Sequence, residues 1–285
     1  MRAIVFNNTC RFHHGSAAVM RVLHDALTRA GIEITQSVYG NTRKFEKRFP
    51  SWDDAAFDAA DLIVINGEGT MHDDSGMSAF LMDKVLAKAG HRKTALVNSL
   101  WQNMSPHYTR MLQDLDLVTA REPASAQAME LESAIVIPDL SYFDVPPRSP
   151  LPPGGLVKGT FYRRAHAKMS CDTTVDVTTQ DWAHLVNSLR AADALFTGKH
   201  HEVYAACIAR CPFVVSAINT HKVSALGQLI DRELPIVHPD ADEADIRRTL
   251  AVAAQDADGL FAALFDKMET LRRTHDPARL FASLA

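Results

Sequence analysis

Two acidic side chains occupy loops that directly follow predicted strands in the first half of the 285-residue sequence. Glu68 lies in the loop at 66–70, after the apolar run at 62–65, and Asp139 follows the apolar run at 134–137. In a parallel sheet the carboxyl ends of the strands meet at one edge, where ligands collect. A carboxylate there can act as a general acid, a general base or a nucleophile. We therefore expect Glu68 and Asp139 to be catalytic candidates, with a cap or turn role as the plain alternative.

Four further side chains in neighbouring loops are candidates for binding an acceptor. Asn7, His13 and His14 lie in the polar loop after the first predicted strand, and Trp101 follows the fourth. An indole can stack on a sugar ring, although it can equally cover the edge of a sheet. His13 and His14 precede a helix, where capping is the alternative to ligand contact. We expect these four residues to bind the acceptor.

A turn in the second half gathers positive charge between a predicted strand and a predicted helix. It contains Gly198, Lys199, His200 and His201, and Lys222 lies in a later loop of the same half. Glycine allows a tight turn, and the N–H groups at a helix start together with a lysine favour an anion. Imidazole titrates near neutral pH and can move protons. We expect these five residues to bind an anionic donor and His201 also to be catalytic, with a solvated helix cap as the alternative.

The elements that must position these side chains alternate between short apolar strands and amphipathic helices. In the first half we expect strands at 2–6, 32–38, 62–65, 94–98, 117–120 and 134–137, with helices at 17–30, 54–60, 77–90, 106–115 and 123–129. In the second half we expect strands at 194–197 and 213–216, with helices at 180–191, 202–209, 224–229, from 242 onward and at 257–273. This order requires parallel sheets covered by helices on both faces.

A segment rich in proline and glycine, at 145–155, interrupts the alternation. Proline cannot continue a helix or a central strand, so this segment is predicted to link two lobes. We place an N-terminal Rossmann-like lobe at 1–147, which carries the acceptor side and the loops of Glu68 and Asp139. A C-terminal Rossmann-like lobe at 148–285 carries the donor anion site and a closing C-terminal helix. The predicted fold class is α/β, with two Rossmann-like lobes facing a cleft in a GT-B-like arrangement.

Composition narrows the classes of function. The formal net charge of −4 argues against a nucleic-acid-binding protein, which needs clustered Lys and Arg. The sequence has no run of about 18 apolar residues that would suggest a membrane span, and its start lacks the features of a signal peptide. The four cysteines have no C-x-x-C spacing. We expect a cytoplasmic protein, with peripheral contact at the inner face of the membrane left open.

The ordered set of loops resembles the polysaccharide pyruvyl transferase family. The residues that carry this resemblance are Asp61 to Thr70 with Asp73, then Arg121, Glu122 and Ser125, then Pro138 and Asp139, then Lys199, His201, Ala205, Pro212 and Lys222. The resemblance implies a GT-B-like fold and a transferase that works on bacterial cell-surface polysaccharide, with phosphoenolpyruvate as the usual donor. Two positions depart from the family pattern. Glu68 stands where a further glycine is common, and Lys199 replaces an arginine, which keeps the charge but loses the bidentate fork.

Two enzyme hypotheses follow. In the first, Lys199, His201 and Lys222 hold the carboxylate and phosphate of phosphoenolpyruvate, and His201, Glu68 and Asp139 supply the acid and the base for transfer of the pyruvyl group to sugar hydroxyls. In the second, the chain is a retaining glycosyltransferase for a 2-keto sugar acid of Kdo type, carried as a CMP conjugate. Asp139 would then be the nucleophile and Glu68 the acid and base, with Lys199 and His201 on the phosphate.

A third hypothesis is a non-catalytic sugar-binding protein of the same fold. For the two enzyme hypotheses we expect no metal and no cofactor. The expected partners are an anionic small-molecule donor and a saccharide acceptor, either free or lipid-linked, and no nucleic acid.

Overall fold

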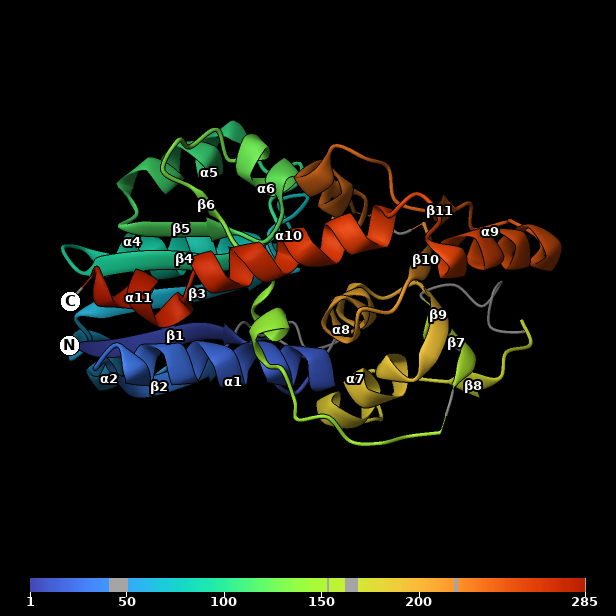
Figure 1. The fold of residues 1–285 in the computed structure, drawn as a ribbon. Helices are drawn as coiled ribbons and strands as arrows, with labels where there is room; N and C mark the ends of the chain where they lie inside the picture. The colour runs from blue at the N-terminus through green and yellow to red at the C-terminus, as the bar shows by residue number, and fades with distance from the viewer. Residues whose placement is uncertain (41–50, 153, 162–168, 218–219, 285) are drawn as a thin grey trace. The chain divides into compact units, whose positions relative to one another are not determined.

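The computed structural model describes residues 1–40, 51–152, 154–161, 169–217 and 220–284. By its contacts the chain divides into two compact units. Unit 1 contains Met1–Phe12, Val19–Leu140 and Arg272–Ala285, and unit 2 contains His13–Ala18 and Ser141–Leu271. Each unit has its own parallel sheet, and Figure 1 shows the elements of both. Among the described residues, no helix combines the length and the apolar character needed to cross a lipid bilayer.

Unit 1 is built on a six-stranded parallel sheet in the order β2-β1-β3-β4-β5-β6. Its strands are β1 (Arg2–Asn8), β2 (Glu33–Tyr39), β3 (Leu62–Glu68), β4 (Lys93–Ser99), β5 (Leu117–Ala120) and β6 (Ile135–Val136). Its helices are α1 (His14–Arg29), which begins among the residues of unit 2, α2 (Asp54–Asp58), α3 (Gly76–Phe80), α4 (Ala87–Ala89), α5 (Pro106–Met111), α6 (Pro123–Ala128) and α11 (Pro277–Ala282). A π-helical stretch at Leu81–Leu86 joins α3 to α4, so 76–89 is one continuous helix.

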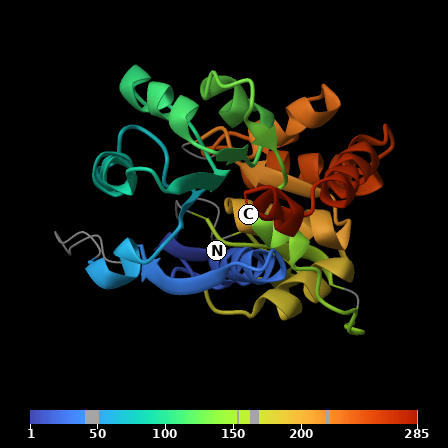
Figure 2. The ribbon, with the colours of Figure 1, turned by 90° about the vertical axis from the view of Figure 1, so that its left-hand side faces the viewer.

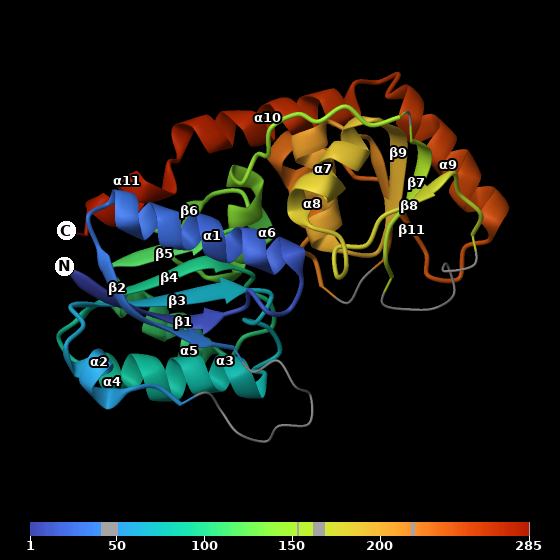
Figure 3. The same ribbon diagram turned by 90° about the horizontal axis from the view of Figure 1, so that it is seen from below.

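Both faces of this sheet are covered. One face packs its alternate strand residues against α2, the 76–89 helix and α5, in a cluster that includes Phe6, Ile65, Phe57 and Met82. The other face carries α1 and α11, and Figures 2 and 3 show α11 on the opposite side of the sheet from the 76–89 helix. Burial on both faces explains why the central strands β1, β3 and β4 contain continuous apolar runs rather than alternating residues.

Unit 2 is built on a five-stranded parallel sheet in the order β11-β10-β9-β7-β8. Its strands are β7 (Gly155–Lys158), β8 (Thr173–Thr174), β9 (Ala192–Thr197), β10 (Phe213–Ser216) and β11 (Ile236–Val237). Its helices are α7 (Trp182–Arg190), α8 (His200–Ala209), α9 (Glu243–Gln255) and α10 (Leu260–Thr274), the last turn of which belongs to unit 1. Figures 1 and 3 show α7 and α8 on one face of the sheet and α9 on the other.

The predicted pair of Rossmann-like lobes is confirmed. The division of the chain differs from the predicted boundary at residue 147 in three respects. Unit 2 takes over at Ser141 and also contains His13–Ala18, and Arg272–Ala285 belongs to unit 1. The last difference has a physical reason: Pro277, Leu280 and Phe281 of α11 lie against apolar residues of β4, of β5 and of the segment just after β6, so the end of the chain completes the first core.

Candidate functional site

The carboxyl ends of three adjacent strands in unit 1 share an unusual backbone conformation. Glu68 is the last residue of β3, and Asn7 and Asn98 are the next-to-last residues of β1 and β4; the φ angles of Asn7, Glu68 and Asn98 are 60°, 36° and 57°. Asparagine tolerates this left-handed region, but a glutamate there is uncommon and costs about 1–3 kcal/mol. Such strain persists only where the surroundings impose it. The three residues therefore mark this edge of the sheet as a functional-site candidate.

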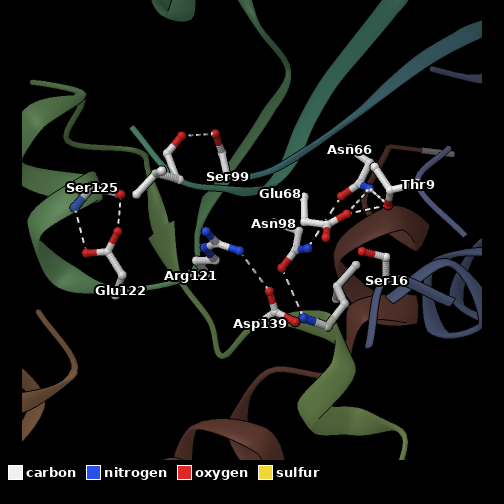
Figure 4. A network of polar contacts seen from close by, with 12 residues as sticks. Thr9, Ser16, Asn66, Glu68, Asn98, Ser99, Arg121, Glu122, Ser125 and Asp139 are labelled. Atoms are coloured by element: carbon white, nitrogen blue, oxygen red, sulfur yellow. Dashed lines mark hydrogen bonds and ion pairs between the residues drawn. The ribbon is translucent and has the colours of Figure 1, made fainter. Parts of the chain in front are cut away.

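Side-chain hydrogen bonds hold the strained edge in place (Figure 4). The Nδ2 atom of Asn7 donates to the carbonyl oxygen of Asn66 at 2.6 Å, and Asn66 Nδ2 donates back to the carbonyl oxygen of Asn7 at 3.2 Å. The same Nδ2 of Asn66 lies 3.3 Å from Glu68 Oε2, which also accepts a hydrogen bond from the Thr9 hydroxyl. The Glu68 carboxylate is 4% exposed and has a fixed orientation.

Glycine is required at one position of this loop. A Cβ on Gly67 would lie 2.8 Å from the Cα of Ser99 and 2.5 Å from its Oγ. β3 and β4 therefore approach too closely for any side chain at Gly67. At Gly69, in contrast, a Cβ would meet only Arg121 Nη2, at 3.9 Å.

Asp139 forms a buried ion pair. Its Oδ2 lies 3.1 Å from Arg121 Nη1, and neither side chain has any exposed surface. The next residue, Leu140, donates its backbone N–H to Asn98 Oδ1 at 3.0 Å, and Asn98 Nδ2 reaches Asn66 Oδ1 at 3.4 Å. Glu68 and Asp139 thus belong to one polar network, connected through Asn66 and Asn98. A carboxylate committed to a buried guanidinium is costly to separate from it, so Asp139 is better suited to positioning than to nucleophilic attack.

The Arg-Glu and Ser positions of the sequence motif have identifiable local roles. Glu122 is the N-cap of α6 and accepts hydrogen bonds from both the backbone N–H and the hydroxyl of Ser125. The Ser125 hydroxyl oxygen accepts from the Trp101 backbone N–H at 2.7 Å. This connects α6 to the end of β4.

Two of the expected acceptor residues of unit 1 are buried. Trp101 is 1% exposed and packs in the apolar core with Met71 and Ala120 among others, so its ring offers no surface to a sugar. Asn7 is 3% exposed, and its amide is used by Asn66 and Thr70. The expectation that a sugar stacks on Trp101 is therefore wrong, because the indole is buried in the apolar core that packs against the sheet.

In unit 2, the turn from β9 to α8 is held tightly. The Gly198 N–H donates to the carbonyl oxygen of Thr160 at 2.9 Å, and a Cβ on Gly198 would lie 3.1–3.2 Å from Phe161. Lys199 is the N-cap residue of α8, and its side chain makes no capping hydrogen bond. The turn therefore presents an amine and a helix start together, which is the arrangement that binds anions.

Glu202, in the first turn of α8, organises this region. Its carboxylate accepts hydrogen bonds from the N–H and hydroxyl of Thr160, from the Thr197 hydroxyl and from the Val177 N–H. The side chain is fully buried, and burial raises the pKa of Glu202 although these hydrogen bonds oppose the shift. Three segments of unit 2 are thus fixed around one carboxylate.

Lys199 is half-buried, and burial lowers the pKa of its amine, while the carboxylates of Glu202 and Asp176 act in the opposite direction. The desolvated amine gains more from an incoming anion than one in bulk water would. Lys222 is also buried, at 7% exposed.

Three histidine rings lie close together in unit 2. The rings of His200 and His201 have centroids 3.9 Å apart, and His13 stands edge-on to His201 at 4.7 Å. A Cβ on Gly15 would lie 2.6 Å from the His201 Cβ, so only glycine permits this approach. The His14 N–H donates to Val177 O at 2.9 Å. His13 and His14 were expected with the acceptor loops of the first lobe, but their contacts place them in unit 2.

Sequence reasoning assigned no role to several residues that organise the site: Thr9, Asn66, Asn98, Arg121 and Glu202. Arg121 carried a detectable signal, because a charged residue directly after a buried strand needs a partner. Glu202 carried none, because an acidic residue in the first turn of a helix is ordinary.

No protein-family model and no curated protein sequence matches the chain. Its fold does match solved structures. The spinosyn forosaminyltransferase SpnP aligns over 100% of this chain and 98% of its own, with a TM-score of 0.61 at 15% identity. The spinosyn rhamnosyltransferase SpnG, solved with thymidine diphosphate, aligns over 100% of both chains, with 0.59 at 12% identity. UGT89C1 of Arabidopsis thaliana aligns over 99% of this chain and 98% of its own, with 0.57 at 10% identity. These similarities establish a GT-B fold with two Rossmann-like units.

Proposed function

We propose that this chain is a GT-B-fold transferase that moves a group from an anionic, phosphate-bearing donor to a hydroxyl of a saccharide. The observation that carries the proposal is the turn from β9 to α8. It combines the start of a ten-residue helix with the half-buried amine of its N-cap residue Lys199, on a turn that Gly198 and Glu202 hold in place.

The donor we favour is phosphoenolpyruvate. The resemblance to pyruvyl transferases supports it, and so does the demand for two cationic groups, since this donor carries a phosphate and a carboxylate. Lys199 and Lys222 are both buried to a degree that strengthens their attraction for anions. We assign Lys199 to the phosphate and Lys222 to the carboxylate, and we assign His200 and His201 to the same donor.

The reaction forms a ketal. A proton is added to the methylene carbon of phosphoenolpyruvate, which leaves the central carbon electrophilic. Two hydroxyls of one sugar then add to that carbon, the bond to the phosphate oxygen breaks, and inorganic phosphate leaves with the hydroxyl protons taken up by base. His201 and Glu68 are the candidate proton donor and acceptor, because an imidazole and a carboxylate with a fixed orientation suit those roles. Asp139 then positions Arg121 rather than reacting.

The saccharide side of the proposal rests on unit 1. Its strained edge at Asn7, Glu68 and Asn98 presents amide and carboxylate groups, which are the partners that sugar hydroxyls require. We propose a bacterial cell-surface polysaccharide or its lipid-linked precursor as the acceptor.

A nucleotide-linked sugar acid is the second candidate donor, and the specific observation in its favour is the fold shared with glycosyltransferases such as SpnG, solved with thymidine diphosphate. Its retaining form needs a free carboxylate nucleophile. The buried pairing of Asp139 with Arg121 weighs against that step.

The test is a phosphate-release assay with phosphoenolpyruvate and a panel of oligosaccharides, with product mass measured in parallel. A mass gain of one pyruvyl group, together with one phosphate released, supports the proposal. Transfer only from a CMP-linked sugar acid would replace phosphoenolpyruvate with the second donor. Saccharide binding without transfer from any donor would contradict the proposal and support the third hypothesis, a non-catalytic sugar-binding protein.

A further inference from the structure

A pocket in unit 2 lies at the opposite end of β9 from the Lys199 turn. It has a volume of about 460 Å³ and is lined by Arg148, Ser149, Pro150, Leu151, Asn187, Arg190 and Ala191. Arg190 and Ala191 immediately precede β9, whereas Lys199 follows it. Six residues of strand span roughly 20 Å, so this pocket is separate from the proposed donor site.

The proline-rich segment forms one wall of this pocket because α7 binds it. The Nδ2 of Asn187 donates to Pro147 O at 3.2 Å, and its Oδ1 accepts from the Ser149 N–H at 3.0 Å. Arg190 Nη1 donates to Pro146 O at 3.0 Å and to Asn187 Oδ1 at 2.8 Å. These contacts turn the linker into an ordered wall.

Two arginines, Arg148 and Arg190, line this pocket. Across the ranges that the structure describes, no carboxylate pairs with Arg148 or Arg190, and all hydrogen bonds of Arg190 leave from Nη1. Burial and the neighbouring Arg148 both lower the pKa of Arg190, so the two cations repel each other. An oxyanion between them would relieve this repulsion and use the remaining Nε and Nη2 donors.

The other lining groups narrow the chemistry of the ligand. Pro150, Leu151 and Ala191 provide apolar surface, which suits the C–H face of a pyranose ring, and Ser149 can hydrogen-bond a hydroxyl. The volume lies within the range of small-ligand sites, roughly 300–1,000 Å³. A small inorganic anion would leave most of this space and all of its apolar wall unused.

We propose that this pocket binds a carboxylate-bearing sugar residue of the polysaccharide on which the enzyme acts. The inference rests on the proposed function, because each pyruvyl ketal formed adds such a carboxylate to the polymer. A segment that is already modified would then be retained here, and the polymer would stay bound between transfers.

Binding is measured by calorimetry with the whole chain and three sugars: methyl glucoside, glucuronate and the 4,6-pyruvyl ketal of methyl glucoside. We expect the two carboxylated sugars to bind and the neutral one not to. Arg148→Ala is the chosen variant, since the Arg148 side chain is exposed and forms no hydrogen bond or ion pair with the residues that the structure describes, and it should weaken binding about tenfold or more. Arg110→Ala, an exposed arginine on α5, is the matched control and should leave binding unchanged.

Two further arms separate this site from the donor site. Lys199→Ala should weaken donor binding by about tenfold or more and leave binding of the carboxylated sugars intact, so failure of the proposed function is distinguishable from failure of this inference. Arg148→Ala should raise the KM for a polymeric acceptor without changing transfer to a monosaccharide acceptor. Equal binding of methyl glucoside, unchanged affinity in Arg148→Ala, or inorganic phosphate binding as tightly as the carboxylated sugars would each overturn the assignment.

Discussion

At the scale of single residues, Lys199 is the side chain on which the proposed chemistry depends most. Its amine is half-buried at the start of α8, where the helix dipole and the desolvated charge act on the same anion. Replacing it with alanine should weaken donor binding by about tenfold to a hundredfold, as expected for loss of a charge-assisted contact of roughly 1.5–3 kcal/mol. Isothermal calorimetry with phosphoenolpyruvate measures the loss. Lys199→Arg is the matched control and should keep most of the affinity.

The same residue sets a pH dependence. Burial lowers the pKa of Lys199 from the usual 10.5, so its charge is lost at a lower pH than that of an exposed lysine. The contribution of its charge to donor affinity is therefore complete below that lowered pKa and disappears as the pH rises through it. A series of donor dissociation constants from pH 7 upward should show this weakening. A flat profile in the wild-type chain would mean that Lys199 does not carry the donor's charge.

Glu202 is a positioning residue in this account. Glutamine has the same shape, but its Nε2 would present hydrogens to two donors that now point at Oε2, the Thr160 N–H and the Thr197 hydroxyl. Glu202→Gln should lower the melting temperature and raise the donor KM more than it lowers kcat, because the turn that carries Lys199 loosens. Thermal unfolding and steady-state kinetics give the two readouts. A fall in kcat with an unchanged donor KM would instead place Glu202 in the chemical step.

Glu202 also gives unit 2 a pH-dependent stability. Because burial raises its folded-state pKa, its contribution to stability is complete below the unfolded value of about 4.3 and declines as the pH rises through the folded value. Glu202→Gln cannot titrate, so the difference in unfolding free energy between wild type and variant should change with pH in that direction.

At the scale of elements, the close approach of β3 and β4 can be tested by comparing two alanine variants, one at Gly67 and one at Gly69. A methyl group at Gly67 would meet backbone and side-chain atoms of Ser99 at 2.5–2.8 Å, and the same group at Gly69 would meet only Arg121 Nη2 at 3.9 Å, an ordinary van der Waals distance. Gly67→Ala should therefore cost about 1–3 kcal/mol and lower the melting temperature by several degrees. Gly69→Ala should have little effect. Equal melting temperatures would contradict the strand geometry at this edge.

Element identity was largely predictable where hydrophobic periodicity is strong. β1, β3, β4, β5 and β10 follow from apolar runs, and α1, α7 and α8 from their amphipathic or alanine-rich patterns. β8 and β11 were not predicted, because each has two residues and is defined by its pairing with a neighbouring strand rather than by its own sequence. β7 was missed because it begins at Gly155, inside the segment expected to be a linker.

The polar site was also predictable only in part, because its loops follow from the sequence whereas its contacts depend on tertiary packing. Loops after parallel strands can be found from sequence, and Glu68 and Asp139 do belong to one network. The ion pair of Asp139 with Arg121, the burial of Trp101 and the grouping of His13 with His201 depend on tertiary packing. Spacing along the chain contains no information about those contacts.

At the scale of the whole molecule, the end of the chain belongs to the first unit. Phe281 of α11 is 2% exposed and lies beside Val97, Leu117 and Ile137 of the unit 1 sheet. Phe281→Ala should cost about 3–5 kcal/mol through lost burial and the cavity left behind. Hydrogen exchange should show the loss of protection in β4 and β5 while α7 and α8 stay protected. Loss confined to unit 2 would contradict the assignment of Arg272–Ala285 to unit 1.

The central claim is that unit 2 binds an anionic donor at the start of α8, and titration calorimetry with phosphoenolpyruvate, CMP and thymidine diphosphate on wild type and Lys199→Ala tests it most directly. We predict that wild type binds phosphoenolpyruvate and that Lys199→Ala loses about tenfold or more in affinity. Binding of a nucleotide alone, still dependent on Lys199, would keep the site and change the donor. Binding that is the same in both proteins, or no binding of any of the three anions, would contradict the claim.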